Sequence, residues 1–155
     1  MPAVGQSPAS LSPYLAVRGA QAAIDFYVQA LGATLDFKLV DPSDGRIGHA
    51  ELLFGATRVF IADEYPDFGA VGPETLGGSP VKFHLDVADA DAFVANAVRH
   101  GASVLRAVKL EFHGHRSGLI ADPFGYSWFI ASKVEEVSAE EMQRRWNAMT
   151  AGSLS

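Results

Sequence analysis

Two stretches of this chain repeat each other: V-R-G-A-Q-A-A-I at residues 17–24 and V-A-D-A-D-A-F-V at residues 87–94. A second pair, R-V-F-I-A-D at 58–63 and S-W-F-I-A-S at 127–132, recurs at nearly the same distance. The offset is 70 residues for the first pair and 69 for the second. A duplicated unit of this size predicts two similar α+β modules, and two such modules can face each other across a pocket.

The apolar pattern predicts the same order of elements in both halves. Residues 12–63 read strand, helix, strand, strand, strand, with a Gly55-Ala56 turn between the last two strands. Residues 81–131 repeat this order, and the turn before the last strand is D-P-F-G at 122–125. Ser138, with a glutamate three residues later, forms a capping box that predicts a C-terminal helix.

The predicted fold is therefore α+β, with two βαβββ modules that form a half-open, cupped mixed sheet with helices on the outside, plus a C-terminal helix. The expected boundaries are a flexible arm at 1–10, a first module at 11–64, a linker at 65–79, a second module at 80–135, and a C-terminal helix and tail at 136–155.

Composition excludes several classes of function. The chain has 155 residues, a formal net charge of −6 and no cysteine. The acidic balance argues against nucleic-acid or anionic-membrane partners, since both require a basic surface. The missing cysteines exclude disulfides, thiolate nucleophiles and Cys-ligated zinc. Because the N-terminus does not resemble a signal peptide and no apolar run approaches the roughly 20 residues of a membrane span, we expect a cytoplasmic protein.

Strand parity gathers polar and aromatic side chains on the sheet face away from the helices. The Gly55-Ala56 turn pairs Glu51 with Phe60, and the same reasoning across D-P-F-G pairs Gly118 with Phe129 and Arg116 with Ala131. The predicted ligand-binding residues on this face are Tyr14, His49, Glu51, Phe60, His84, Arg116 and Phe129.

This face has two interpretations, a small-molecule pocket and a sheet face that only meets solvent. Two large apolar residues, Phe60 and Phe129, favour the pocket, because a solvated face seldom carries them. Glu51 beside His49 allows a general base as well as a buried ion pair or hydrogen-bond network.

The order of the elements, with D-P-F-G before the last strand, resembles the glyoxalase, bleomycin-resistance and extradiol-dioxygenase superfamily, also called the vicinal oxygen chelate superfamily. The resemblance covers about residues 11–135 and is closest to a glyoxalase-like branch of mostly unassigned function. The pieces that carry it are S-P-Y-L-A-V (12–17), A-I-D-F-Y (23–27), D-G-R-I-G-H-A-E-L (44–52), G-A-T-R-V-F-I-A-D-E (55–64), R-S-G-L-I-A-D-P-F-G (116–125) and V-S-A-E-E-M-Q-R-R (137–145).

The resemblance implies positions for a divalent metal, on the first and last strand of each module. These positions hold Ser12, Phe60, Lys82 and Phe129. Phenylalanine cannot coordinate a metal, and a lysine ammonium would repel it, so we expect no metal at this site and no other cofactor. A divalent ion on His49, Glu51 and His84, or at the H-G-H of 113–115, is the less favoured alternative.

The sequence leaves three candidate functions. The first is a metal-independent protein that binds a small, partly aromatic molecule, as drug-binding members of the resembled superfamily do. The second is a metal-dependent lyase, isomerase or dioxygenase with a non-standard metal site, and the third is a non-catalytic dimeric module. We favour the first, and we expect a homodimer because each module is small and members of this superfamily pair their modules.

Overall fold

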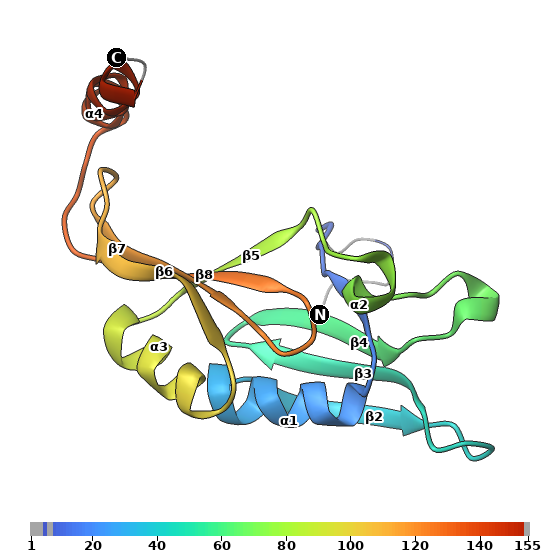
Figure 1. Cartoon of the computed structure of the whole chain (residues 1–155). Helices are drawn as coiled ribbons and strands as arrows, with labels where there is room; N and C mark the ends of the chain where they lie inside the picture. Colours follow the sequence, from blue (N-terminus) through green and yellow to red (C-terminus); the bar gives the residue numbers. More distant parts are fainter. Residues whose placement is uncertain (1–4, 6–7, 154–155) are drawn as a thin grey trace. The chain divides into compact units, whose positions relative to one another are not determined.

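The computed structural model describes residues 5 and 8–153 and divides into two compact units, Met1–Leu76 and Gly77–Ser155 (Figure 1). Residues 1–4 and 6–7 of the expected arm, and 154–155 of the expected tail, lie outside the described residues. Each unit is described by itself below.

The first unit has the predicted βαβββ order. Its elements are β1 (Tyr14–Val17), α1 (Ala20–Leu31), β2 (Thr34–Val40), β3 (Ile47–Phe54), β4 (Thr57–Asp63), the 3-10 helix η1 (Pro66–Phe68) and α2 (Pro73–Leu76). The strands form a mixed sheet in the order β1-β4-β3-β2, in which β1 and β4 are parallel and the other pairs antiparallel. The α+β class and the mixed sheet are confirmed for this unit.

Helix α1 covers one face of the first sheet (Figure 1). Its apolar stripe, which includes Ile24 and Tyr27, is buried, as are Leu52 of β3 and Ile61 of β4, and the helix contacts both strands. The Gly55-Ala56 turn pairs Phe54 with Thr57 and Glu51 with Phe60, as predicted. Because neighbouring residues of a strand point to opposite faces, burial of Ile61 turns the adjacent Phe60 away from α1.

The start of α1 shows how the sequence fixes the helix on its sheet. Gly19 precedes the helix in a left-handed conformation and offers no side chain to bind its first amides. Asp63, at the end of β4, accepts hydrogen bonds from Ala20 N (2.8 Å) and from Ile47 N (2.7 Å). A single carboxylate therefore joins the helix start, β3 and β4.

The second unit repeats the order. Its elements are β5 (Lys82–Asp86), α3 (Ala90–Arg99), β6 (Ser103–Leu110), β7 (His115–Ala121), β8 (Ser127–Lys133) and α4 (Ala139–Ser153). The sheet order is β5-β8-β7-β6, which is the order of the first unit. Asp89 begins α3 by accepting a hydrogen bond from Ala92 N. The predicted duplication is thus confirmed in the topology.

The turn before β8 differs from the expectation. Asp122 N donates to Tyr126 O, so only Pro123–Gly125 form the loop, and Gly125 takes the positive φ that such a turn requires. The Asp122 carboxylate accepts from Phe124 N, Tyr126 N and Trp128 Nε1, which makes the turn rigid. The predicted pairing across this turn is wrong by one residue: Leu119 lies opposite Phe129, and Gly118 opposite Ile130.

The segment expected as a linker, 65–79, contains ordered elements. The short helices η1 and α2 lie in it. The Glu64 carboxylate accepts hydrogen bonds from Gly72 N (2.7 Å), Thr75 Oγ1 (2.6 Å) and Arg18 Nε (3.0 Å). These bonds hold α2 against the end of β1, where the backbone of Gly72 approaches Ala16 too closely for any side chain.

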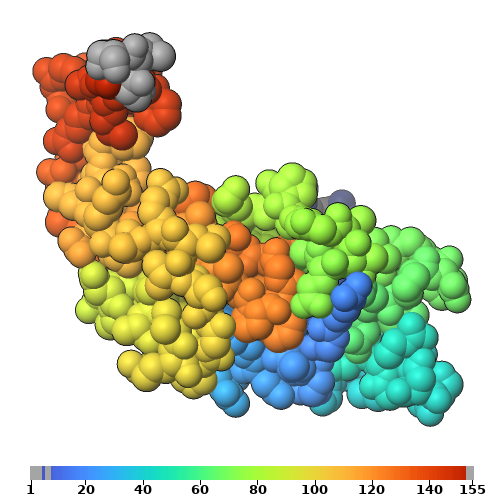
Figure 2. All heavy atoms as spheres, in the orientation of Figure 1, coloured from blue at the N-terminus to red at the C-terminus, as the bar shows by residue number. Residues whose placement is uncertain are grey.

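Helix α4 begins at the predicted cap, where Ser138 Oγ accepts from Glu141 N. It contacts the turn between β6 and β7, because Arg145 donates to Phe112 O (2.9 Å) and the Trp146 ring lies 5.6 Å from the Phe112 ring. Trp146 and Met149 remain 49% and 50% exposed, and Figure 2 shows α4 in red with an open surface. Among the described helices, none combines the length and apolarity needed to cross a bilayer.

Candidate functional site

Four of the predicted site residues meet on the first sheet, on the face away from α1. Tyr14 of β1 and Glu51 of β3 are the neighbours of Phe60 on either side, because β4 lies between those strands. The Phe60 ring is 5.6 Å from the Tyr14 ring and 5.3 Å from the His49 ring. Phe37 of β2 adds a further ring, 5.9 Å from His49.

Hydrogen bonds join the polar members of this cluster into a chain. The Tyr14 hydroxyl lies 2.7 Å from His49 Nδ1, and His49 Nε2 lies 2.9 Å from Glu51 Oε2. Arg58 Nη1 donates to the other Glu51 oxygen at 2.6 Å and to Asp36 at 2.9 Å. The residues come from all four strands of the first sheet, so the register of these strands sets the geometry.

The charges of this cluster follow from its hydrogen bonds. The bond from His49, and then the Arg58 guanidinium, hold the pKa of the Glu51 carboxyl below its ordinary value, against an opposing effect of burial. Partial burial, followed by the Glu51 charge, raises the pKa of Tyr14. At neutral pH the cluster therefore contains an ionised carboxylate and a protonated phenol.

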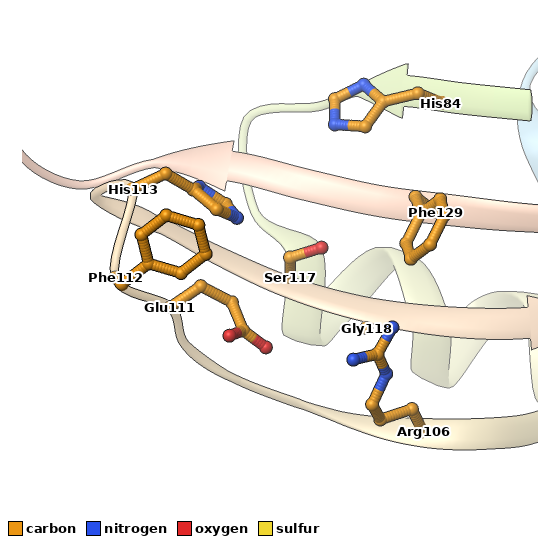
Figure 3. A pocket seen from close by; sticks show the side chains of 8 residues that line it. All are labelled: His84, Arg106, Glu111, Phe112, His113, Ser117, Gly118 and Phe129. Atoms are coloured by element: carbon orange, nitrogen blue, oxygen red, sulfur yellow. The ribbon is translucent and has the colours of Figure 1, made fainter. Parts of the chain in front are cut away.

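A pocket of about 300 Å³ lies on the corresponding face of the second sheet (Figure 3). Its lining residues are His84, Arg106, Glu111, Phe112, His113, Ser117, Gly118 and Phe129. His84 lies opposite Phe129 in the β5–β8 pair, which is equivalent to Tyr14 opposite Phe60 in the first unit. The repeat thus places an aromatic side chain at the same position of both sheets.

Arg106 and Phe129 form one side of this pocket. The Arg106 guanidinium lies 5.7 Å from the centre of the Phe129 ring, a cation–π arrangement, and Figure 3 shows it directed toward that ring. Within the described part of the chain, Arg106 forms no ion pair. A cation of this kind can bind a carboxylate or phosphate group of a ligand whose ring stacks on Phe129.

The other side of the pocket is formed by the turn between β6 and β7. His113 Nδ1 lies 3.3 Å from His115 Nδ1, and Phe112 is the neighbouring aromatic wall. Burial, and then the His115 charge, lower the pKa of His113, while Glu111 acts in the opposite direction. A largely neutral His113 can donate or accept one hydrogen bond from a ligand.

Arg116 does not lie with the other predicted site residues. The one-residue difference in register places it opposite Ser132 and turns it to the α3 side of the sheet. There it forms a two-point ion pair with Asp91 of α3, at 2.8 and 3.0 Å. Ser117 takes its place on the pocket side.

Several pocket residues are absent from the binding residues that the sequence predicted. They are Arg106, Glu111, Phe112, His113 and Ser117. Irregular pairing of β6 on both sides of Arg106 breaks the alternation from which a strand face is predicted. For His113, the H-G-H motif at 113–115 is a signal that the sequence does contain.

The residues at the resembled metal positions do not fit a divalent ion. Phe60 packs between the rings of Tyr14 and His49, and Phe129 lies beneath Arg106. Over residues 5 and 8–153, no three histidine, aspartate or glutamate side chains are grouped so as to hold a metal. Phe60 and Phe129 offer no ligand atom, Lys82 offers an ammonium that repels a cation, and of the four positions Ser12 alone offers an oxygen.

A family model matches most of the chain. The model of the Glyoxalase/Bleomycin resistance protein/Dioxygenase superfamily matches residues 9–130. An uncharacterized protein of Mycobacterium tuberculosis H37Rv is 40% identical over 144 residues, which cover 91% of this chain and 84% of that protein.

Solved structures show the same fold. The gene product At5g48480 of Arabidopsis thaliana has a TM-score of 0.65 and 26% identity, and the match covers 81% of this chain and 99% of that one. A glyoxalase-related enzyme from Fulvimarina pelagi has a TM-score of 0.61 and 18% identity, with 81% and 89% covered.

Proposed function

The chain belongs to the Glyoxalase/Bleomycin resistance protein/Dioxygenase superfamily, and on this premise we propose that it binds a small, partly aromatic molecule without the help of a metal ion. The observation that carries the proposal is the pocket of the second unit, in which the guanidinium of Arg106 lies over the Phe129 ring.

The lining suits such a ligand. Phe129 and Arg106 lie at one end of the pocket, and Phe112, Glu111 and His113 lie at the other, so each end offers an aromatic ring with polar groups beside it (Figure 3). A few polar groups among aromatic walls are typical of small-molecule sites, because the walls supply affinity and the polar groups fix orientation. An aromatic carboxylate satisfies both Arg106 and Phe129.

Binding and metal content test the proposal together. Benzoate titrated into the purified chain should shift the ring-proton NMR signals of His84 and His113, and EDTA should change neither the binding nor the thermal midpoint. A stoichiometric divalent metal after purification, lost together with binding on chelation, would support the metal-dependent lyase, isomerase or dioxygenase alternative. Absence of any shift with millimolar aromatic carboxylates would refute the binding proposal.

We also propose that the chain binds no nucleic acid, on the ground of the net charge of −6, and that it is cytoplasmic, since it has no cysteine for the disulfides common in secreted proteins. Fractionation of cells that produce the tagged chain tests the location. Recovery of the chain outside the cytoplasm would contradict it.

A further inference from the structure

The pocket of the second unit carries opposite charges at its two ends. The guanidinium of Arg106 lies at one end, 5.7 Å from the centre of the Phe129 ring. The carboxylate of Glu111 lies at the other end, together with Phe112 (Figure 3). Among the residues that the structure describes, neither Arg106 nor Glu111 forms an ion pair, although both line one pocket of about 300 Å³. Both charges are therefore available to a bound molecule.

Main-chain pairing fixes the positive end. Arg106 of β6 lies opposite Leu119 of β7, and Leu119 lies opposite Phe129 of β8. Residues that lie directly opposite each other on neighbouring strands share one face of the sheet, so the guanidinium and the Phe129 ring meet across β7. The register of three strands, and not a bond to Glu111, sets the position of this cation.

Hydrogen bonds of the backbone fix the negative end. Glu111 N donates to His115 O at 2.8 Å, and Gly114 N donates to Glu111 O at 3.1 Å. The next carbonyl, Phe112 O, accepts from Arg145 of α4 at 2.9 Å. The Glu111 side chain is half-buried and starts from a backbone that is bonded on both sides, so its carboxylate is held apart from Arg106.

This distribution of charge favours a ligand that carries both signs. A ligand carboxylate at Arg106 leaves the carboxylate of Glu111 without a partner, and a second anion there would be repelled. An ammonium group at Glu111 gains an ion pair and can also contact the negative face of the Phe112 ring. Burial, and then the His115 charge, lower the pKa of His113, so at neutral pH its imidazole is largely neutral and does not repel an ammonium group.

We propose that this pocket selects a zwitterionic ligand, in which one aromatic ring carries a carboxylate on one side and an ammonium group on the other. The carboxylate bonds Arg106, the ring packs on Phe129, and the ammonium group bonds Glu111. A volume of about 300 Å³ is at the lower end for small-molecule sites and suits one ring with two short substituents. This assignment rests on the binding function proposed above and adds the charge pattern of the ligand.

Two ligands of nearly equal shape test the assignment on the wild-type chain. Para-(aminomethyl)benzoate ends in an ammonium group where para-ethylbenzoate ends in a methyl group, and both carry the same carboxylate. Calorimetric titration should show the aminomethyl compound binding about tenfold more tightly, since only this compound forms a bond between charged groups at Glu111. Equal affinities, or tighter binding of the ethyl compound, would overturn the proposal.

A substitution at the negative end tests which residue makes the distinction. Glu111→Gln keeps the shape of the side chain and should erase the difference in affinity between the two ligands. Glu140→Gln removes one negative charge from an exposed position of α4 and should preserve the difference. A preference for the aminomethyl compound that persists in folded Glu111→Gln would overturn the role of this carboxylate, and the proposal with it.

The orientation of the ligand gives a readout that needs no variant. In the wild-type complex, the methylene protons of para-(aminomethyl)benzoate should show nuclear Overhauser effects to the Phe112 ring, and the ring protons beside the carboxylate should show them to Phe129. The opposite orientation would overturn the proposal. If benzoate and para-ethylbenzoate bind without any preference for the zwitterion, the zwitterion assignment fails alone. If none of these aromatic carboxylates binds, the binding function fails as well.

Discussion

The hydroxyl of Tyr14 lies 2.7 Å from Nδ1 of His49, although the two residues are 35 positions apart in the chain. Their strands are not neighbours, since β4 lies between β1 and β3. The side chains meet across Phe60, which contacts both rings. The stability of this arrangement depends on the charge of Glu51 behind His49, and that dependence can be measured.

Glu51→Gln should lower the thermal midpoint at neutral pH. The pKa of Glu51 is lowered by folding, so its contribution to stability is present above the ordinary carboxyl pKa and is lost as pH falls through the lowered value. The difference in melting temperature between the wild-type chain and Glu51→Gln should therefore narrow from pH 7 toward pH 3. Glu140→Gln, an exposed position on α4, is the control and should show no such gap. If the difference between wild type and Glu51→Gln does not change with pH, the ionised Glu51 carboxylate does not stabilise the fold as inferred.

Two adjacent residues of β4 should respond differently to alanine. Ile61 is fully buried against α1, and Ile61→Ala should cost about 2–5 kcal/mol of unfolding free energy. Phe60 lies on the opposite face, so Phe60→Ala should cost less in spite of the larger side chain. Urea denaturation of both variants measures the difference. The reverse order would show that Phe60 belongs to the core.

Phe129→Ala should weaken the binding of benzoate while the fold survives. Loss of an aromatic contact of this size is worth about 1–3 kcal/mol, which corresponds to roughly a five- to 150-fold rise in Kd. Phe68→Ala is the matched control, because Phe68 is 85% exposed in η1 of the other unit. Equal affinity in wild type and Phe129→Ala would exclude a stacking role.

Arg106→Gln should discriminate between charged and neutral ligands. Removal of the guanidinium should lower benzoate affinity about tenfold, with a smaller effect at high salt, and leave benzamide affinity unchanged. Arg99→Gln, an exposed arginine on α3, controls for net charge. If the affinities for benzoate and benzamide fall equally, Arg106 acts by packing in the pocket wall and does not bind the charge of the ligand.

Sedimentation at micromolar concentration should give twice the 16.5 kDa mass of the chain. The half-exposed Trp146 and Met149 on α4 leave apolar surface that association can cover. Sedimentation of Trp146→Glu tests whether this surface forms part of the dimer interface. A 16.5 kDa species at these concentrations would refute the homodimer.

Repeated motifs and short-turn geometry were enough to predict most of the fold. The repeated motifs predicted two βαβββ modules, and the Gly55-Ala56 turn predicted the pairing of Glu51 with Phe60. A two-residue loop allows only one register. The sequence therefore assigned Phe60, Glu51 and His49 correctly to the same face of the sheet. The same reasoning failed at D-P-F-G. Asp122 N donates to Tyr126 O, so the loop has three residues, 123–125, instead of the four of the motif.

What the sequence alone determined is the order of elements, the duplication, and which side chains leave the core of the first sheet, since all three follow from periodicity and short turns. The tertiary structure decided the partners of those side chains. Arg116 turned to Asp91 through a single step in register, and Arg106 reached Phe129 through irregular pairing in β6. Such contacts join residues far apart in the chain, and their geometry depends on bulges and carboxylate-bound turns that hydrophobic periodicity does not record.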